Sequence, residues 1–149
     1  MGGFLVSRRV AVVIINRANY ARIKSALVAA QGRSDLELMP LVGASASLKR
    51  FGNLTEVMEQ DGLPPEHVFF SSLEGDSPQS MVKSTALAVS ELGSALEQIQ
   101  PDGVLTVADR YETLAAAIAS RYLNIPLLHT QGGEVSGSIR RERQACRNQ

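Results

Sequence analysis

Hydrophobic residues recur along the chain in two alternating patterns, short continuous runs and longer stretches with helical spacing. The short runs, rich in valine, isoleucine, leucine and phenylalanine, cover residues 10–15, 36–42, 68–70, 104–107 and 125–129. Continuous apolar runs of this length are typical of strands that are buried on both faces of a parallel sheet. Each run therefore predicts one strand.

Between these runs, apolar residues spaced three or four apart predict helices. One helix follows the polar break at 16–19 and ends near Gly32, a short one covers 51–60, and an alanine-rich one covers 111–123. Residues 43–47 are a small-residue loop suited to the edge of a ligand site.

The longest predicted helix has a clear start signal. Ser77 is a good N-cap and Pro78 suits the first helical position, so this helix runs from there to about Ile99. Strands and helices alternate to the end of the pattern. This order favours an α/β fold with a Rossmann-like, doubly wound parallel sheet and right-handed crossovers.

Composition narrows the class of protein. The 149 residues, 44% of them hydrophobic, fit one domain, and no linker or internal repeat divides them. Lys plus Arg equal Asp plus Glu at 15 each, so net charge attracts neither nucleic acid nor a membrane surface. The single cysteine, Cys146, excludes an internal disulfide, and no apolar run is long enough to span a bilayer. A cytoplasmic protein without membrane or nucleic-acid partners is expected.

Polar residues follow three of the predicted strands, where ligands of open α/β sheets bind. These segments are 16–20, 108–110 and 129–134. Because the carboxyl ends of parallel strands lie at one edge of the sheet, the fold gathers their ionisable side chains around one crevice. Those side chains are Arg17, Asp109, Arg110, His129 and Glu134.

Each of these residues also has a purely structural interpretation. Asp109 alone is predicted to cap a helix, with Arg110 as its surface partner, and Glu134 would be a solvated carboxylate. His129 at a strand end would be a half-buried histidine with its hydrogen bonds satisfied. The chain lacks G-x-G-x-x-G after its first strand, a G-x-x-x-x-G-K loop and metal-ligand spacing. Physical chemistry alone predicts an anion-tolerant ligand site without cofactor or metal.

A collinear set of motifs is more specific. The chain contains R-A-N-Y at 17–20, F-G-N-L-x-x-x-M-E-x-D-G at 51–62, D-S-P-x-x-M-x-K-S at 76–84, P-D-x-V-L-x-x-x-D-R-x-E-x-L-A-A-A-I-A at 101–119 and N-I-P-L-x-H-x-x-G-G-E-V-S-G at 124–137. Together they resemble the hydrolysing UDP-N-acetylglucosamine 2-epimerases, including the bacterial members that start the synthesis of sialic-acid-like nonulosonates.

The resemblance implies that residues 1–139 are the N-terminal Rossmann-like domain of a two-domain GT-B-like fold. The other domain would hold most of the UDP. The implied reaction removes the proton at C2 of a UDP-amino-sugar, eliminates UDP and adds water, which releases a free 2-epimer of the N-acetylmannosamine type. No cofactor is implied. The implied partners are the sugar nucleotide and either a homo-oligomer or a complementing C-terminal chain.

The matched motifs also imply two sets of site residues. The catalytic set is Asp109, Glu134 and Gln131, in which Asp109 is the main acid/base candidate. The substrate-binding set is Arg17, Asn19, Arg110 and His129, in which the guanidinium groups suit phosphate or carboxylate.

Two positions depart from the common pattern of the family. Gln131 stands where many members carry glutamate, and an amide cannot shuttle protons; Asn19 stands where aspartate is commoner. Each departure is compatible with a different amino-sugar, such as a diacetylated UDP-sugar.

Residues 140–149 leave the family pattern abruptly. The expected continuation is D-E-S-V-R-H-A-V-T, whereas the chain reads R-R-E-R-Q-A-C-R-N-Q. Our hypothesis for the change is an inserted base. The chain alone is then predicted to be inactive, because part of the site and the UDP-binding half would be missing. The alternatives for the chain are a non-catalytic sugar- or phosphate-binding remnant and an unstable product of a disrupted gene. The alternative for the tail is a solvated basic extension that binds an acidic partner.

The gene sequence tests the inserted base. One permitted codon choice for 140–149 is CGA CGA GAG CGT CAG GCA TGC CGT AAC CAA, and removing its first base encodes D-E-S-V-R-H-A-V-T. We expect sequencing of the genomic DNA to find codons that restore this motif after one deletion. Codons that restore no motif in either shifted frame would contradict the frameshift.

Overall fold

A parallel five-stranded sheet forms the centre of the computed structural model, which describes residues 7–75 and 77–133. The strands are β1 (Arg8–Ile14), β2 (Leu36–Val42), β3 (His67–Val68), β4 (Gly103–Val107) and β5 (Leu127–Thr130). The helices are α1 (Arg17–Gln31), α2 (Leu54–Gln60), α3 (Pro78–Ile99) and α4 (Tyr111–Tyr122). The predicted α/β class and the parallel sheet are confirmed.

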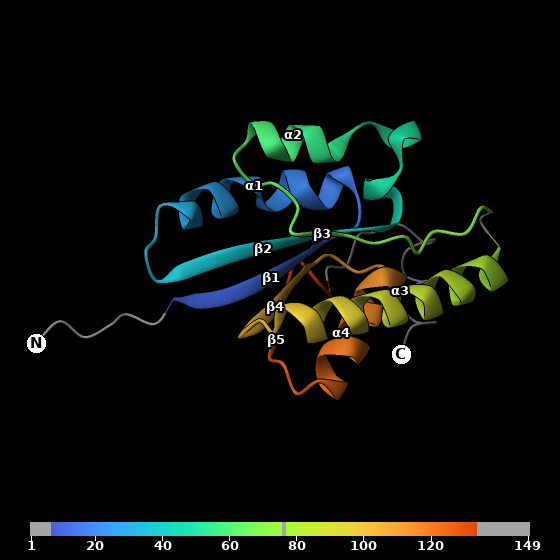
Figure 1. Cartoon of the computed structure of the whole chain (residues 1–149). Helices are drawn as coiled ribbons and strands as arrows, with labels where there is room; N and C mark the ends of the chain where they lie inside the picture. Colours follow the sequence, from blue (N-terminus) through green and yellow to red (C-terminus); the bar gives the residue numbers. More distant parts are fainter. Residues whose placement is uncertain (1–6, 76, 134–149) are drawn as a thin grey trace, which may run out of the picture.

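The sheet is covered on both faces. Helices α1 and α2 lie above it in Figure 1, and α3 and α4 lie below it. Strand β1 shows why its run of apolar residues is continuous. Ala11, Val13 and Ile15, which follows the strand, belong to the hydrophobic cluster with α3 and α4, whereas Val12 and Ile14 belong to the cluster with α1 and α2. Both sides of the strand are therefore buried.

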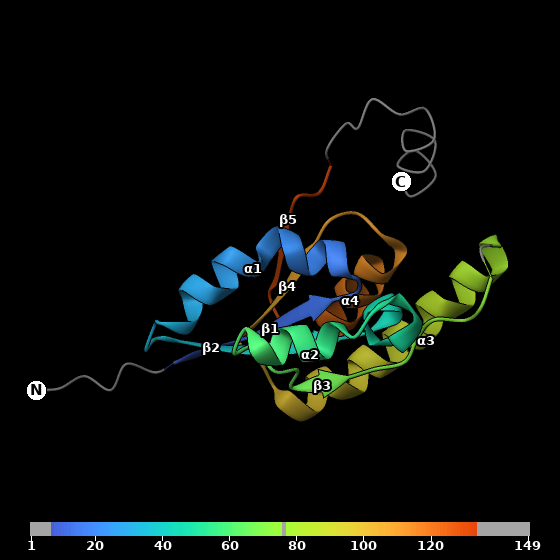
Figure 2. The ribbon, with the colours of Figure 1, turned by 90° about the horizontal axis from the view of Figure 1, so that it is seen from above.

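The order of the strands defines the edge at which a ligand would bind. It is β3-β2-β1-β4-β5, so the chain builds outward from β1 to β3 and then returns to β4 on the other side of β1. Figure 2 shows β3 and β5 at opposite edges of the sheet, with β1 between them. Strand order reverses between β1 and β4, which makes their carboxyl ends the topological switch point.

Several local boundaries differ from the sequence prediction. Residues 43–47 are not an open loop, because Ala44–Ser47 form a 3-10 helix and Lys49–Phe51 form another. Gly52 has φ +94°, which no helix allows, so α2 begins only at Leu54 instead of residue 51. The predicted start of α3 is confirmed, since the Ser77 side chain accepts a hydrogen bond from the amide of Ser80.

The third and fifth strands also shift. Strand β3 covers His67–Val68 rather than residues 68–70, although Phe69, fully buried, still donates its amide to the carbonyl of Val42 at 2.9 Å, and Phe70 is 67% exposed. Strand β5 begins at Leu127 rather than residue 125 because Asn124 adopts φ +57° and Pro126 has no N–H for the ladder.

No helix among residues 7–75 and 77–133 combines the length and apolar character needed to cross a membrane.

The close contact between Gly43 and Phe69 yields a stability prediction. A Cβ at position 43 would overlap the ring of Phe69, which is fully buried. Gly43→Ala should therefore lower the free energy of unfolding by about 1–3 kcal/mol, measured by urea denaturation. Gly93→Ala is the control, because its Cβ meets open space in the middle of α3; it should raise stability by about 0.5–1 kcal/mol. Equal effects of the two substitutions would contradict the packing account.

Candidate functional site

Asp109 joins the loops that follow β4 and β5. Its Oδ2 accepts a hydrogen bond from the amide of Gly133 at 2.6 Å, and its Oδ1 lies 3.3 Å from Nε2 of His129. The preceding residue, Ala108, has φ +61°, a left-handed turn that directs the chain away from the strand. The helix-cap prediction for Asp109 is wrong, since the N-cap of α4 is Arg110. Asp109 and His129, predicted from separate motifs, are thus in contact.

His129 is held on its other side by β4. Thr106 and His129 are partners in the register of β4 and β5, and Thr106 Oγ1 lies 2.9 Å from Nδ1 of His129. The imidazole is partly exposed, at 32% of its side chain. A Cβ at position 132 would overlap Nε2 of this ring, so Gly132 is required for the close approach of the β5 loop.

Arg110 turns toward Glu112 rather than toward Asp109. Its Nε and Nη2 donate to the two carboxylate oxygens of Glu112 at 3.0 and 3.2 Å. The Glu112 carboxylate is nearly buried, and its hydrogen bonds raise the pKa of the Arg110 guanidinium further. The predicted surface pair of Arg110 with Asp109 is therefore wrong. Arg110 instead anchors the first turn of α4.

Arg17, at the start of α1, lies against the loop before α2. A Cβ at Gly52 would overlap Nη1 of Arg17, so the guanidinium rests directly over this glycine. Two of the motifs that are far apart in the sequence, R-A-N-Y and F-G-N, thus meet at this point. The side chain of Arg17 is exposed.

Asn19 ties α1 to β4 across the switch point. Its Nδ2 donates to the carbonyl of Val107 at 3.2 Å, and its own amide donates to the side chain of Asn16, the N-cap of α1. Asn19 is only 2% exposed, and its Oδ1 is buried without a hydrogen-bond partner among the described residues. The amide predicted to bind substrate therefore lies inside the protein, where it links the start of α1 to the carboxyl end of β4.

A second contact fixes the same helix. Asp61, just after α2, accepts hydrogen bonds from Lys24 Nζ at 2.7 Å and from the Tyr20 hydroxyl at 2.6 Å. The hydrogen bond from Lys24, and to a smaller extent that from Tyr20, holds the pKa of the Asp61 carboxyl below its usual range. Burial, and to a smaller extent the nearby Asp61 carboxylate, raises the pKa of the Tyr20 hydroxyl. The first two turns of α1 are thus held against the segment that follows α2.

Gln131 follows β5 in a left-handed conformation, with φ +56°. Its Oε1 accepts a hydrogen bond from Nη1 of Arg22 at 3.3 Å, so α1 reaches over to the β5 loop. Glu134 and residues 140–149 lie outside the described residues. Of the predicted site residues, the structure brings Asp109 and His129 into contact, places Gln131 two residues from His129, and directs Arg110 and Asn19 to structural partners.

Sequence reasoning missed Thr106, Glu112, Gly52 and Arg22. The signal for Glu112 was present, since 112, 115, 116 and 119 share one helical face, on which a carboxylate interrupts alanines. Thr106 is likewise the polar residue of an otherwise apolar strand. The contacts of Gly52 and Arg22 depend on tertiary structure and had no local signal.

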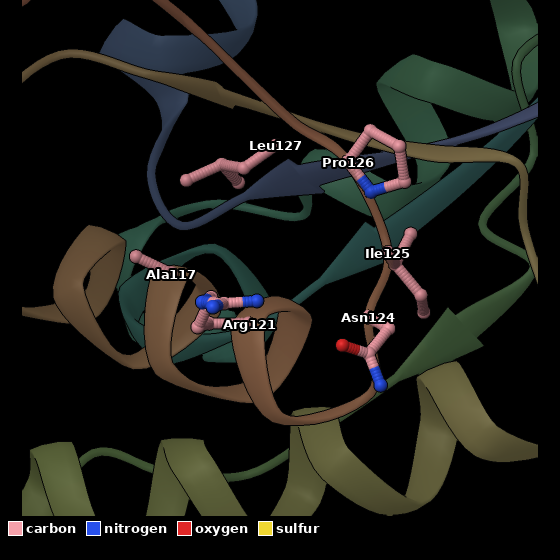
Figure 3. A pocket seen from close by; sticks show the side chains of 6 residues that line it. All are labelled: Ala117, Arg121, Asn124, Ile125, Pro126 and Leu127. Atoms are coloured by element: carbon pink, nitrogen blue, oxygen red, sulfur yellow. The ribbon is translucent and has the colours of Figure 1, made fainter.

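A hollow between α4 and β5 lies away from these residues. Its lining consists of Ala117, Arg121, Asn124, Ile125, Pro126 and Leu127, which Figure 3 shows around the chain that leads into β5. This is the amino end of β5, whereas Asp109 and His129 lie at the carboxyl ends. Within the described parts of the chain, no group of three His, Cys, Asp or Glu side chains could hold a metal ion.

Comparison with known families shows to which family the chain belongs. The model of the family described as UDP-N-acetylglucosamine 2-epimerase matches residues 49–142. The chain belongs to this family. The matched stretch includes Thr106, Asp109, Glu112 and His129, so the contact between the β4 and β5 loops lies within it.

Individual relatives agree. The chain is 30% identical over 132 residues to the UDP-N,N'-diacetylbacillosamine 2-epimerase (hydrolyzing) of Legionella pneumophila, covering 89% of this chain and 35% of the relative. It is 25% identical to the UDP-N-acetylglucosamine 2-epimerase of Neisseria meningitidis, covering 89% and 34%. The chain thus spans about a third of the length of the curated relatives it matches.

A solved structure shares the fold. The UDP-GlcNAc 2-epimerase from Neisseria meningitidis bound to UDP-GlcNAc superposes with a TM-score of 0.71 at 21% identity, covering 89% of this chain and 34% of that one. At this identity the likeness establishes the arrangement of strands and helices, which agrees with the sheet described above.

The pairing of Arg110 with the buried Glu112 yields a second stability prediction. Glu112→Gln keeps the size of the side chain and removes the charge that both guanidinium donors use. We expect the free energy of unfolding to fall by about 1–2 kcal/mol, because hydrogen bonds to charged groups are the stronger ones and Arg110 stays partly hydrated. The exposed Glu97→Gln should change it by less than about 0.5 kcal/mol. Thermal unfolding compares the two, and a neutral Glu112→Gln would show that the pair contributes nothing.

Proposed function

We propose that this chain supplies the sugar-facing half of the active site of a hydrolysing 2-epimerase that acts on a UDP-amino-sugar. The observation that carries the proposal is the Asp109 carboxylate. The amide of Gly133 and the imidazole of His129 hold it at the carboxyl edge of the sheet, beside the switch point, in a chain of the epimerase family.

The chemistry needs a group that takes up and delivers protons. In the proposed reaction a base removes the proton at C2, the C1–O bond to UDP breaks with its electron pair leaving on UDP, and water then adds at C1 while a proton returns to C2 from the opposite face. Asp109 is our candidate for one of these proton transfers, and Glu134 for the other. Gln131 cannot carry a proton, so its role would be to hydrogen-bond the sugar from its contact with Arg22.

The cationic residues fit a diphosphate. Arg17 projects from the first turn of α1, where the helix N-terminus also favours an anion. Its guanidinium has the fork geometry for phosphate oxygens. Arg110 would act indirectly, by fixing the start of α4 and hence the loop that carries Asp109. Asn19 would do the same for the start of α1.

The relatives indicate the class of substrate. One is named for UDP-N,N'-diacetylbacillosamine and another is solved with UDP-GlcNAc. Both compounds are UDP-linked 2-acetamido sugars, and we propose this class as the substrate. We further propose that residues 1–139 form the N-terminal domain. Turnover then requires the remaining two thirds of the relatives' length, because this half provides only one side of the nucleotide-binding site.

The test measures UDP release and the free sugar from UDP-GlcNAc and from UDP-N,N'-diacetylbacillosamine. One sample is the 149-residue chain, and the other is residues 1–139 joined to the C-terminal two thirds of the Legionella relative. Turnover is expected only in the joined protein. Asp109→Asn in the joined protein should reduce kcat by about 10²–10⁴-fold, the usual contribution of a proton-transfer group.

Asp35→Asn is the matched control, because Asp35 pairs with Arg33 at the amino end of β2, the opposite edge of the sheet. It should leave kcat unchanged. Turnover by the short chain would overturn the requirement for a second domain, and a joined protein that releases UDP equally well with Asp109→Asn would remove Asp109 from the mechanism. Binding without release from either substrate would favour a non-catalytic sugar-binding role.

A further inference from the structure

The contact of Thr106 with His129 has no part in the proposed function so far. Thr106 is 1% exposed, in the centre of the sheet, and its Oγ1 lies 2.9 Å from Nδ1 of His129. A hydroxyl sealed from water has a single hydrogen, and that hydrogen must go to an acceptor in the protein. Which acceptor it takes decides the state of the imidazole.

Two acceptors are within reach of Thr106. Nδ1 of His129 is at 2.9 Å, and the carbonyl of Leu128 is at 3.4 Å. Hydrogen bonds from hydroxyl groups are normally about 2.5–3.0 Å between heavy atoms, so the Leu128 carbonyl is beyond the range of a good bond. The hydroxyl hydrogen therefore belongs on the side of Nδ1, and Nδ1 acts as the acceptor.

A neutral imidazole carries one proton, so a bare Nδ1 leaves that proton on Nε2. Nε2 faces Oδ1 of Asp109 at 3.3 Å, and the other carboxylate oxygen accepts from the amide of Gly133 at 2.6 Å. Both carboxylate oxygens then face a donor, Oδ2 in a short hydrogen bond and Oδ1 in a longer contact. In the opposite tautomer the bare Nε2 would face the carboxylate, two acceptors would oppose each other, and Thr106 would keep only the long contact with Leu128.

We propose that Thr106 is a positioning residue for Asp109 and acts through His129. Its hydroxyl selects the tautomer in which the imidazole donates to the carboxylate, and this orients Asp109 for proton transfer, a role that rests on the function proposed above. Gly132 supports the same geometry independently, since any side chain at that position would overlap Nε2 and push the ring off the carboxylate.

The chain is suited to a direct test, because His67 and His129 are its two histidines. In a His67→Gln background, long-range ¹H–¹⁵N NMR of the ring-labelled protein observes His129 alone. At a pH where titration of the same sample finds the ring neutral, we expect the proton on Nε2. The Nδ1 resonance should lie at the position of a nitrogen that accepts a hydrogen bond. Thr106→Val, which keeps the β-branched shape, should move the Nδ1 resonance to the position of an imidazole nitrogen without a donor.

Thr106→Ser is the matched control, because it keeps the hydroxyl and should preserve the Nδ1 resonance. A proton on Nδ1 in the parent protein overturns the proposal without any Thr106 variant, so a Thr106→Val that fails to fold does not protect it. An unchanged Nδ1 resonance in folded Thr106→Val overturns it as well. No sugar nucleotide is present, so this result is independent of turnover, and loss of the proposed function would leave the tautomer assignment standing.

Discussion

Strand β1 is buried on both faces and paired on both edges, and the rest of the sheet is arranged around it. It pairs in parallel with β2 through Ile14 and with β4 from Val10 to Val12. Apolar side chains on both faces of one strand need a layer of helices on each side, and parallel neighbours need crossover connections that provide those helices. The reversal of strand order beside β1 then leaves its carboxyl end facing that of β4, which is where the charged loops meet.

The site depends on a second constraint. The backbone of the turns after β4 and β5 lies close against the side chains of Asp109 and His129. Ala108 and Gln131 adopt left-handed conformations immediately after β4 and β5, and glycines 132 and 133 follow. Such conformations cost free energy, on the order of 1–3 kcal/mol for each residue other than glycine, and persist only where surrounding contacts fix them. Here the fixing contacts are those of Asp109 with His129 and with the Gly133 amide. The same groups that would perform the chemistry therefore also close the two turns.

The sequence predicted the sheet and its helices well, because apolar runs and helical spacing are local signals. Strand β2 was predicted to the residue, and the Ser77–Pro78 start of α3 was correct. The errors lie at the ends of elements, as at β3, where Phe69 packs its ring over Gly43 but lies outside the strand. The convergence of Asp109 and His129 followed from strand topology. The partners of Arg110 and Asn19 did not, because the local sequence cannot tell which polar side chain will find a hydrogen-bond partner within the protein.

Those two residues divide the polar groups of the carboxyl edge into two kinds. Arg110 spends its guanidinium donors on the buried carboxylate of Glu112, and Asn19 spends its amide on the Val107 carbonyl. Both contacts use donors that a substrate would otherwise receive. The buried members of these contacts are Glu112 and Asn19, while the Arg110 side chain is itself 44% exposed. The exposed side chains of Arg17 and Asp109 lie at the same edge, above backbone that these contacts fix. A rigid polar layer below and solvent-facing charges above would suit the proposed proton transfer, because catalytic groups must be held close to their productive positions. A substitution in the buried layer should therefore weaken the site without touching its ligand.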